Sequence, residues 1–159
     1  MRNLILGVFL LAATAQTAWA NEDEIFSCEI GTKTVQISHE NDALVYRFGP
    51  EGKPELTITE PLETVTFNPW PGIGRYIWES VDFRNGGFTY RVYTSVERGP
   101  DATTGLIGSV TVYEGETELA YLPCDEGTPT NSLDRVYDLK KTIGQCWDYD
   151  SESWITTCD

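Results

Sequence analysis

The sequence predicts a mainly β protein, in which about eight antiparallel strands form a meander that closes into a barrel or folds into a sandwich. A short C-terminal helix and a disulfide-closed hairpin follow the strands. Three observations predict this fold. Apolar residues alternate with period two from Phe26 to Leu122, turn-forming residues interrupt this pattern at short intervals, and four cysteines mark the ends of the β region and of the tail.

The expected strands carry apolar side chains at alternate positions, as half-buried strands do. The first are marked by four groups: Val35 and Ile37; Leu44, Tyr46 and Phe48; Leu56 and Ile58; Val65 and Phe67. A proline- and glycine-rich stretch around Trp70 follows, which predicts a surface loop because proline cannot donate to a ladder.

The strongest local signal is a hairpin that turns at Asn85-Gly86-Gly87. It joins a strand over Tyr76–Phe83 to a strand over Phe88–Val96. A loop from Glu97 to Gly105 leads to the last two expected strands, Leu106–Tyr113 and Leu119–Leu122.

One helix is expected after the β region. Its apolar face consists of Leu133, Val136, Tyr137 and Ile143, with Ser132 as the N-cap and Gly144 at the C′ position. We expect residues 125–159, which hold this helix and the disulfide hairpin, to pack on the β domain of residues 21–124.

Residues 1–20 have the pattern of a secretory signal peptide. Arg2 precedes an apolar run from Leu4 to Ala13, and Ala18-Trp19-Ala20 is an A-x-A cleavage site. The run is shorter than the roughly 20 residues that span a bilayer. We therefore expect cleavage after Ala20 and release into the periplasm or the medium. The alternative is an N-terminal anchor that is not cleaved.

All four cysteines lie after the predicted cleavage site, and an oxidising compartment would pair them into two disulfides. Three pairings are possible. We favour Cys28 with Cys124, at the start and the end of the β region, and Cys146 with Cys158, which closes the tail. No Cys-x-x-Cys or Cys/His cluster indicates a metal site, and we expect no cofactor.

The chain is acidic, with a formal net charge of −14 that becomes −15 when Arg2 leaves with the signal peptide. This charge excludes nucleic acid as a partner and disfavours anionic membrane surfaces, because both require Lys and Arg on the protein. A cationic protein remains a suitable partner, and we expect no stable membrane anchoring.

Two kinds of candidate site stand out. Trp70 in its loop, and Trp147 with Trp154 in the tail, are candidate binding residues, since large aromatic side chains outside regular strands often anchor recognition surfaces. Alternatively, each covers an open end of the core. Asp148, Asp150 and Glu152 are weak calcium candidates, but the glycine that an EF-hand loop requires is replaced by Ser153.

Catalytic signals are sparse. His39 is the single histidine and is expected in a polar turn from Ser38 to Asp42. No Gly-x-Ser-x-Gly motif occurs, and no pair of carboxylates is distinguished among 25 acidic residues. We therefore predict no catalytic residues.

The segment Phe26-Ser-Cys-Glu-Ile-Gly-Thr-Lys-Thr-Val35, with Cys124 closing the last strand, resembles small periplasmic β-barrels of bacteria. These include the inhibitors of C-type lysozyme, which also tie an aromatic-x-Cys strand to the C-terminal region. The inhibitors' Ser-Gly-x-x-Tyr loop is not present, and the nearest stretch is Gly86-Gly-Phe-Thr-Tyr90. The resemblance implies an acidic rim that docks on a cationic lysozyme and blocks its cleft.

The sequence therefore predicts a non-enzymatic binding protein, with inhibition of a cationic secreted protein such as lysozyme as one form of that role. The alternatives are a binder of a small molecule or lipid inside a β-barrel and an enzyme that uses carboxylates alone.

Overall fold

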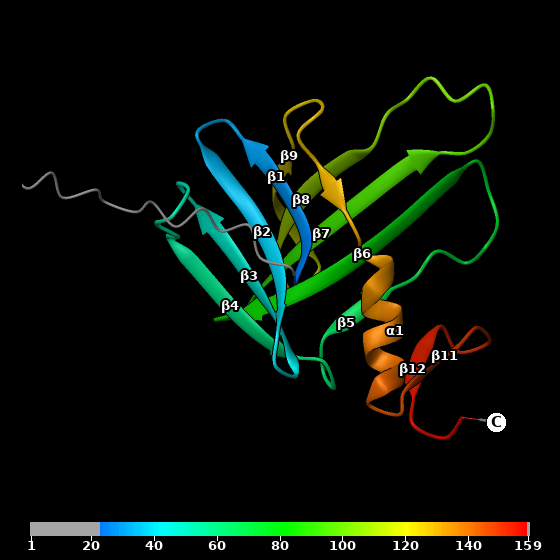
Figure 1. Ribbon diagram of the computed structural model, residues 1–159. Helices are drawn as coiled ribbons and strands as arrows, with labels where there is room; N and C mark the ends of the chain where they lie inside the picture. The colour runs from blue at the N-terminus through cyan, green and yellow to red at the C-terminus, as the bar shows by residue number, and fades with distance from the viewer. Residues whose placement is uncertain (1–22, 159) are drawn as a thin grey trace, which may run out of the picture.

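A computed structural model describes residues 23–158 and contains two five-stranded antiparallel sheets (Figure 1). Sheet A has the order β10-β1-β2-β3-β4, and sheet B has the order β5-β6-β7-β8-β9. The strands of sheet A are β1 (Glu24–Ile30), β2 (Lys33–Glu40), β3 (Ala43–Gly49), β4 (Leu56–Pro61) and β10 (Thr130–Asn131). The strands of sheet B are β5 (Thr66–Asn68), β6 (Tyr76–Asn85), β7 (Phe88–Glu97), β8 (Ile107–Glu114) and β9 (Thr117–Pro123).

The two sheets enclose one apolar core, so the fold is a sandwich and the predicted mainly β class is confirmed. Phe26, Val35 and Tyr46 fill the core from sheet A, and Val81 and Phe83 fill it from sheet B, all of them fully buried. Tyr46 lies against Phe83, with ring centroids 5.3 Å apart. Side chains therefore occupy the space between the sheets.

The predicted hairpin is present. Asn85 pairs with Phe88, and Gly86 and Gly87 between them have φ of 58° and 89°. A two-residue turn with positive φ matches the twist of the flanking strands, and glycine adopts this conformation without steric cost. Residues 23–123 contain nine strands, where about eight were expected before Cys124.

The segment after Cys124 differs in detail from the expected polar connector. Thr130 and Asn131 form β10 by pairing with Ser27 and Phe26 at the free edge of β1. This pairing depends on contacts more than 100 residues apart in the chain, so no local pattern could predict it.

The predicted helix is α1, which spans Asp134–Thr142 and buries Val136 and Lys140. Ser132 is not its N-cap, because Leu133 occupies that position and no side chain caps it. Instead the Asn131 side chain accepts a hydrogen bond from the Leu133 N–H at 3.0 Å. At the other end Gly144 has φ of 82° and its N–H donates to the Lys141 carbonyl, as expected for a C′ glycine.

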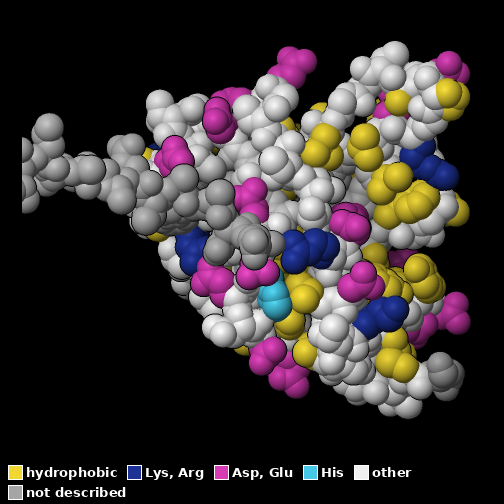
Figure 2. Space-filling view, viewed as in Figure 1, with side chains coloured by type: hydrophobic (Ala, Val, Ile, Leu, Met, Phe, Trp, Pro, Cys, Tyr) yellow, Lys and Arg dark blue, Asp and Glu magenta, His cyan; other side chains and the backbone are white. Residues whose placement is uncertain are grey.

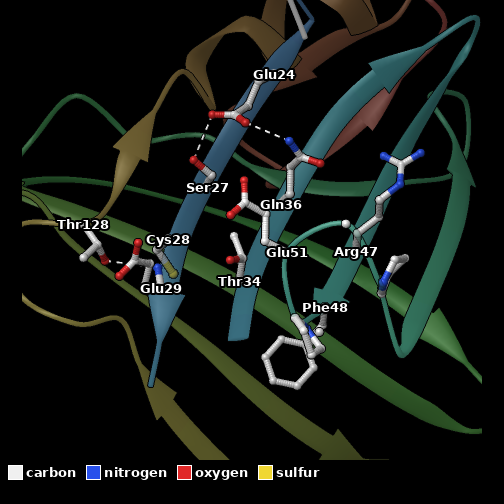
Figure 3. Close-up of a pocket in the computed structure, with 14 residues that line it drawn as sticks. Glu24, Ser27, Cys28, Glu29, Thr34, Gln36, Arg47, Phe48, Glu51 and Thr128 are labelled. Atoms are coloured by element: carbon white, nitrogen blue, oxygen red, sulfur yellow. Dashed lines mark hydrogen bonds between the residues drawn. The ribbon is translucent and has the colours of Figure 1, made fainter. Parts of the chain in front are cut away.

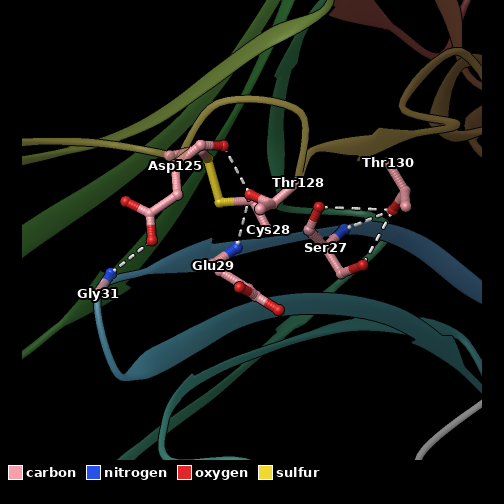
Figure 4. Close-up of a disulfide and its surroundings, with 8 residues drawn as sticks. Ser27, Cys28, Glu29, Gly31, Asp125, Thr128 and Thr130 are labelled. Atoms are coloured by element: carbon pink, nitrogen blue, oxygen red, sulfur yellow. Dashed lines mark hydrogen bonds between the residues drawn. A yellow bond between two sulfur atoms is a disulfide. The ribbon is translucent and has the colours of Figure 1, made fainter.

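Both predicted disulfides are present. Cys28–Cys124 links β1 to the end of β9 across 96 residues (Figure 4), and Cys146–Cys158 closes the tail hairpin of β11 (Cys146–Asp148) and β12 (Ser153–Ile155). The two disulfides indicate an oxidising, extracytoplasmic compartment. The predicted signal peptide and its cleavage site at Ala20 lie outside the described residues. Within residues 23–158, the helix is neither long nor apolar enough to cross a membrane.

The core beside the long-range disulfide should not tolerate an added methyl group at Gly108. A Cβ atom there would lie 2.8 Å from the Cys124 sulfur and 3.3 Å from the Phe26 ring. We expect Gly108→Ala to lower the free energy of unfolding by about 1–3 kcal/mol, measured by chemical denaturation. Gly105→Ala is the matched control, because its Cβ would meet nothing within 4 Å. Equal stability of the two variants would contradict this packing.

Candidate functional site

The candidate site is a groove on the outer, solvent-facing side of sheet A, with a volume of about 500 Å³ (Figure 3). The groove arises because successive side chains along each strand point to opposite faces of the sheet. Phe26, Cys28, Val35 and Ile37 point into the core, so the residues between them, Ser27, Glu29, Thr34 and Gln36, point outward. Each strand thereby supplies polar side chains to one continuous surface.

Register aligns these polar side chains across the sheet. Ser27 on β1 pairs with Gln36 on β2, which in turn pairs with Arg47 on β3. The next row is Glu29, Thr34 and Gly49. The groove therefore runs across three strands.

A tight return of the chain after Gly49 forms one wall. Gly49 has φ of 149°, and a Cβ there would lie 2.5 Å from the backbone nitrogen of Glu55, so only glycine fits. The Glu55 N–H donates to the Phe48 carbonyl at 2.8 Å, which folds residues 50–54 back over the sheet and brings Glu51 to the groove.

The opposite wall is formed by the segment that follows Cys124 (Figure 4). The Asp125 N–H donates to the Glu29 carbonyl at 2.8 Å, and the Thr128 hydroxyl accepts from the Glu29 N–H at 3.1 Å. The Gly31 N–H donates to the Asp125 carboxylate at 2.9 Å. These bonds hold Thr128 at the rim of the groove.

Three carboxylates line the groove. Glu24 is held in place, because it accepts hydrogen bonds of 2.8 Å from the Ser27 hydroxyl and from the Gln36 amide (Figure 3). Glu29 and Glu51 are exposed. Within residues 23–158, none of the three takes part in an ion pair.

The cation that lines the groove is already engaged. Arg47 donates to the Ser38 hydroxyl and to the Glu40 carboxylate, each at 2.7 Å. The hydrogen bond from Ser38, together with Arg47, keeps the pKa of Glu40 below its usual value despite partial burial. The groove therefore presents negative charge with aligned hydroxyl and amide groups, a combination suited to an ammonium or guanidinium group.

The three tryptophans predicted as binding residues lie in two different groups of contacts. Trp154 donates its indole N–H to the Phe67 carbonyl at 2.7 Å, and its ring contacts Tyr137 and Trp147. Tyr137 and Trp154 pack against the core. Trp70 donates to the Ile73 carbonyl at 2.8 Å and lies under the guanidinium of Arg98.

The acidic run in the tail forms a hydrogen-bonded turn. Asp148 accepts bonds from the Ser151 hydroxyl at 2.7 Å and from the Asp150 N–H at 3.0 Å, which lower the pKa of Asp148. Glu152 follows with φ of 48°. No group of three or more His, Cys, Asp or Glu side chains in residues 23–158 is arranged to hold a metal ion.

His39 lies in β2, where it pairs with Leu44, and not in the turn where it was expected. The turn itself is limited to Asn41 and Asp42, because the β2–β3 ladder continues to the Glu40–Ala43 pair. His39 does not line the groove.

Sequence reasoning did not identify the groove. The alternation of polar residues on β1 and β2 was a readable signal for its floor. Glu51 and Thr128 carry no such signal, because they reach the groove through a turn and through the segment after a long-range disulfide.

Compared with models of protein families, with curated proteins and with solved structures, the chain gives no match in any of the three comparisons.

Glu79 and Lys140 are buried ionisable groups that lie away from the groove. Glu79, 9% exposed, points inward from β6, and burial together with the nearby Asp134 carboxylate raises the pKa of Glu79 to about 7. Lys140, 1% exposed, donates to the Leu62 carbonyl and the Gln145 side chain, and burial lowers its pKa to about 8.

Glu79 should make the protein less stable as the pH rises from about 4.5 to about 7. Across this range the folded protein retains a proton that the unfolded chain has released, so raising the pH favours unfolding. We expect Glu79→Gln to leave stability near pH 4 unchanged and to increase it at pH 8 by about 1–3 kcal/mol in urea denaturation. Glu116→Gln, at an exposed turn, is the control. A wild-type stability that does not fall between pH 4.5 and 7 would contradict the prediction.

Proposed function

We propose that this protein is a non-enzymatic interaction protein that binds a cationic partner protein through the acidic groove of sheet A. The observation that carries the proposal is the set of three carboxylates, Glu24, Glu29 and Glu51, that line the groove without an ion pair in residues 23–158. A basic side chain of the partner would supply the missing positive charge.

The groove is built to receive such a side chain without rearrangement. Glu24 is fixed by its bonds to Ser27 and Gln36, and the Gly49 turn fixes the loop that carries Glu51. Pre-ordered carboxylates lose little conformational entropy when they bind, which favours affinity. The two more exposed carboxylates can form charge-assisted hydrogen bonds with a lysine or arginine.

The charge of the whole molecule supports the same class of partner. The formal net charge is −14 for the full sequence, and Figure 2 shows acidic side chains over much of the visible face. A field of this sign attracts a basic protein over distances of about one Debye length, roughly 8–10 Å at physiological salt. It raises the rate of association more than the affinity.

We also propose that the protein is exported from the cytoplasm. An exported protein fits the signal peptide predicted over residues 1–20, with cleavage after Ala20, and both disulfides fit the same route. The protein would meet its partner in the periplasm or outside the cell. The resemblance of the first strand to lysozyme inhibitors makes C-type lysozyme, a cationic secreted protein, the partner to test first.

The test is binding of the mature chain to a C-type lysozyme, measured by isothermal titration calorimetry at several salt concentrations. We expect Glu29→Gln with Glu51→Gln to weaken binding at least about tenfold, because each lost charge-assisted bond is worth about 1.5–3 kcal/mol. The matched control is Glu116→Gln with Glu118→Gln, two exposed acids at the β8–β9 turn. Both variants change the net charge equally, so they differ only in the groove.

Three results decide the outcome. Binding that weakens with salt and depends on Glu29 and Glu51 supports the proposal. Equal loss in both double variants would show attraction to net charge alone and would reject the groove as the site. No binding to lysozyme rejects this partner, and a panel of other basic secreted proteins with the same two variants then tests the class.

A further inference from the structure

One end of sheet B forms a second surface, which we call the tip and define as residues 69–77 and 97–107. It contains the loop between β5 and β6, the loop between β7 and β8, and the ends of the strands that flank them. Figure 1 shows that β6 and β7 continue past sheet A and that both loops project beyond it.

The tip exposes large apolar side chains. Ile73 is 74% exposed, Ile107 48%, Tyr76 42% and Ile77 38%. Seven large apolar side chains are exposed in residues 23–158, and four of them lie in the tip. Tyr76 and Ile77 are consecutive in β6 and point to opposite faces, so the tip exposes apolar side chains on both faces of sheet B. Exposed apolar surface of this kind commonly marks an interaction site.

Hydrogen bonds to the buried Glu97 carboxylate hold the two loops of the tip together. The Glu97 carboxylate, 6% exposed, accepts hydrogen bonds from Arg75 in one loop and from the N–H groups of Thr103 and Thr104 in the other. These partners lower the pKa of Glu97 to about 2, with the Thr103 N–H as the largest cause. The carboxylate therefore remains charged and bonded at all physiological pH values.

Trp70 and Arg98 donate hydrogen bonds to the backbone of the loop that carries Ile73. The Trp70 indole donates to the Ile73 carbonyl at 2.8 Å, and the Arg98 guanidinium lies 4.6 Å from the centre of the Trp70 ring. Arg98 also donates to the Gly74 carbonyl. Ile73 is thus presented by an ordered loop, so little ordering entropy is lost on binding.

The tip is electrically neutral on an acidic molecule. Its charged residues are Arg75, Glu97, Arg98 and Asp101, which sum to zero, so the rest of the chain carries the whole net charge of −14. In Figure 2 this end of the molecule shows apolar side chains together with basic and acidic ones. The tip therefore brings no net charge to an uncharged surface.

We propose that the tip docks on a lipid surface with zwitterionic headgroups by inserting Ile73 and the neighbouring apolar side chains, while the acidic body stays in water. Because the tip projects from the protein, it can insert into a flat, deformable lipid surface, which does not need to offer a complementary cavity. Tyr76 and Trp70 are residue types that favour the boundary between headgroups and acyl chains, where an apolar ring and a polar atom are both accommodated. The negative charge of the rest of the protein repels anionic lipids, so we expect the tip to bind zwitterionic lipids in preference to anionic ones.

The test is co-sedimentation of the full mature chain with phosphatidylcholine/phosphatidylethanolamine vesicles. We expect wild type to partition, and Ile73→Ser to reduce the partition coefficient about tenfold, as expected for losing a buried isoleucine. The matched control is Leu119→Ser on β9, a leucine 51% exposed outside the tip, which should bind like wild type. Brominated acyl chains should quench tryptophan emission in wild type and less in Trp70→Phe.

Several outcomes would overturn the proposal. These are no partition of wild type, equal loss in Ile73→Ser and Leu119→Ser, or binding to anionic vesicles alone. Capture by a protein that depends on Ile73, without vesicle binding, would also reject the lipid in favour of a protein partner. The groove variant Glu29→Gln with Glu51→Gln should partition like wild type, so failure of the groove and failure of the tip can be told apart.

Discussion

The covalent bond between Cys28 and Cys124 is the constraint on which the rest of the architecture depends. It joins a central strand of sheet A to the residue that follows the last strand of sheet B, and it lies against Gly108 and Phe26 in the core. In the chain-entropy model, closing a loop of this length destabilises the unfolded chain by about 4–5 kcal/mol. The bond also fixes where the chain continues, because Asp125 and Thr128 then pair with the backbone of Glu29. One wall of the groove, β10 and the start of α1 all follow from that placement.

A second set of interactions attaches the helix and the tail hairpin to the rest of the protein. In each of them a side chain donates a hydrogen bond to a backbone carbonyl in residues 62–67. Lys140 donates to the Leu62 carbonyl, Gln145 to the Glu63 carbonyl and Trp154 to the Phe67 carbonyl. Among residues 23–158 no carboxylate forms an ion pair with the buried ammonium of Lys140; two hydrogen-bond acceptors and the Trp154 ring offset its desolvation. The tail aromatics therefore have a structural role, which does not depend on any ligand.

Charge and apolar exposure are separated on this molecule. The groove on sheet A carries three carboxylates that form no ion pair within the described part of the chain, residues 23–158. The tip of sheet B instead pairs Glu97 with Arg75 and exposes isoleucines. The two proposed ligands require different surfaces. A cationic protein requires fixed negative charge, whereas a zwitterionic lipid surface requires exposed apolar side chains without net charge. Two surfaces built in these two ways can act on one molecule without competing, because they lie on different sheets.

Features that depend on neighbours along the chain could be predicted before the structure was known. Alternation of apolar residues predicted the strands, Asn85-Gly86 predicted the hairpin, and Gly144 predicted the end of the helix, because these are local backbone preferences. Cysteine positions left three pairings possible, and the favoured one is present. Other features depend on tertiary contacts: the meander divides into two sheets, the side chain of Asn131 and not that of Ser132 bonds to the Leu133 N–H before the helix, and Trp70 bonds to the backbone of the exposed Ile73. The tertiary structure also decided that Glu24, Glu29, Glu51 and Thr128 share one groove. These residues are separated by up to about 100 positions, and only sheet register and the Cys28–Cys124 bond bring them together.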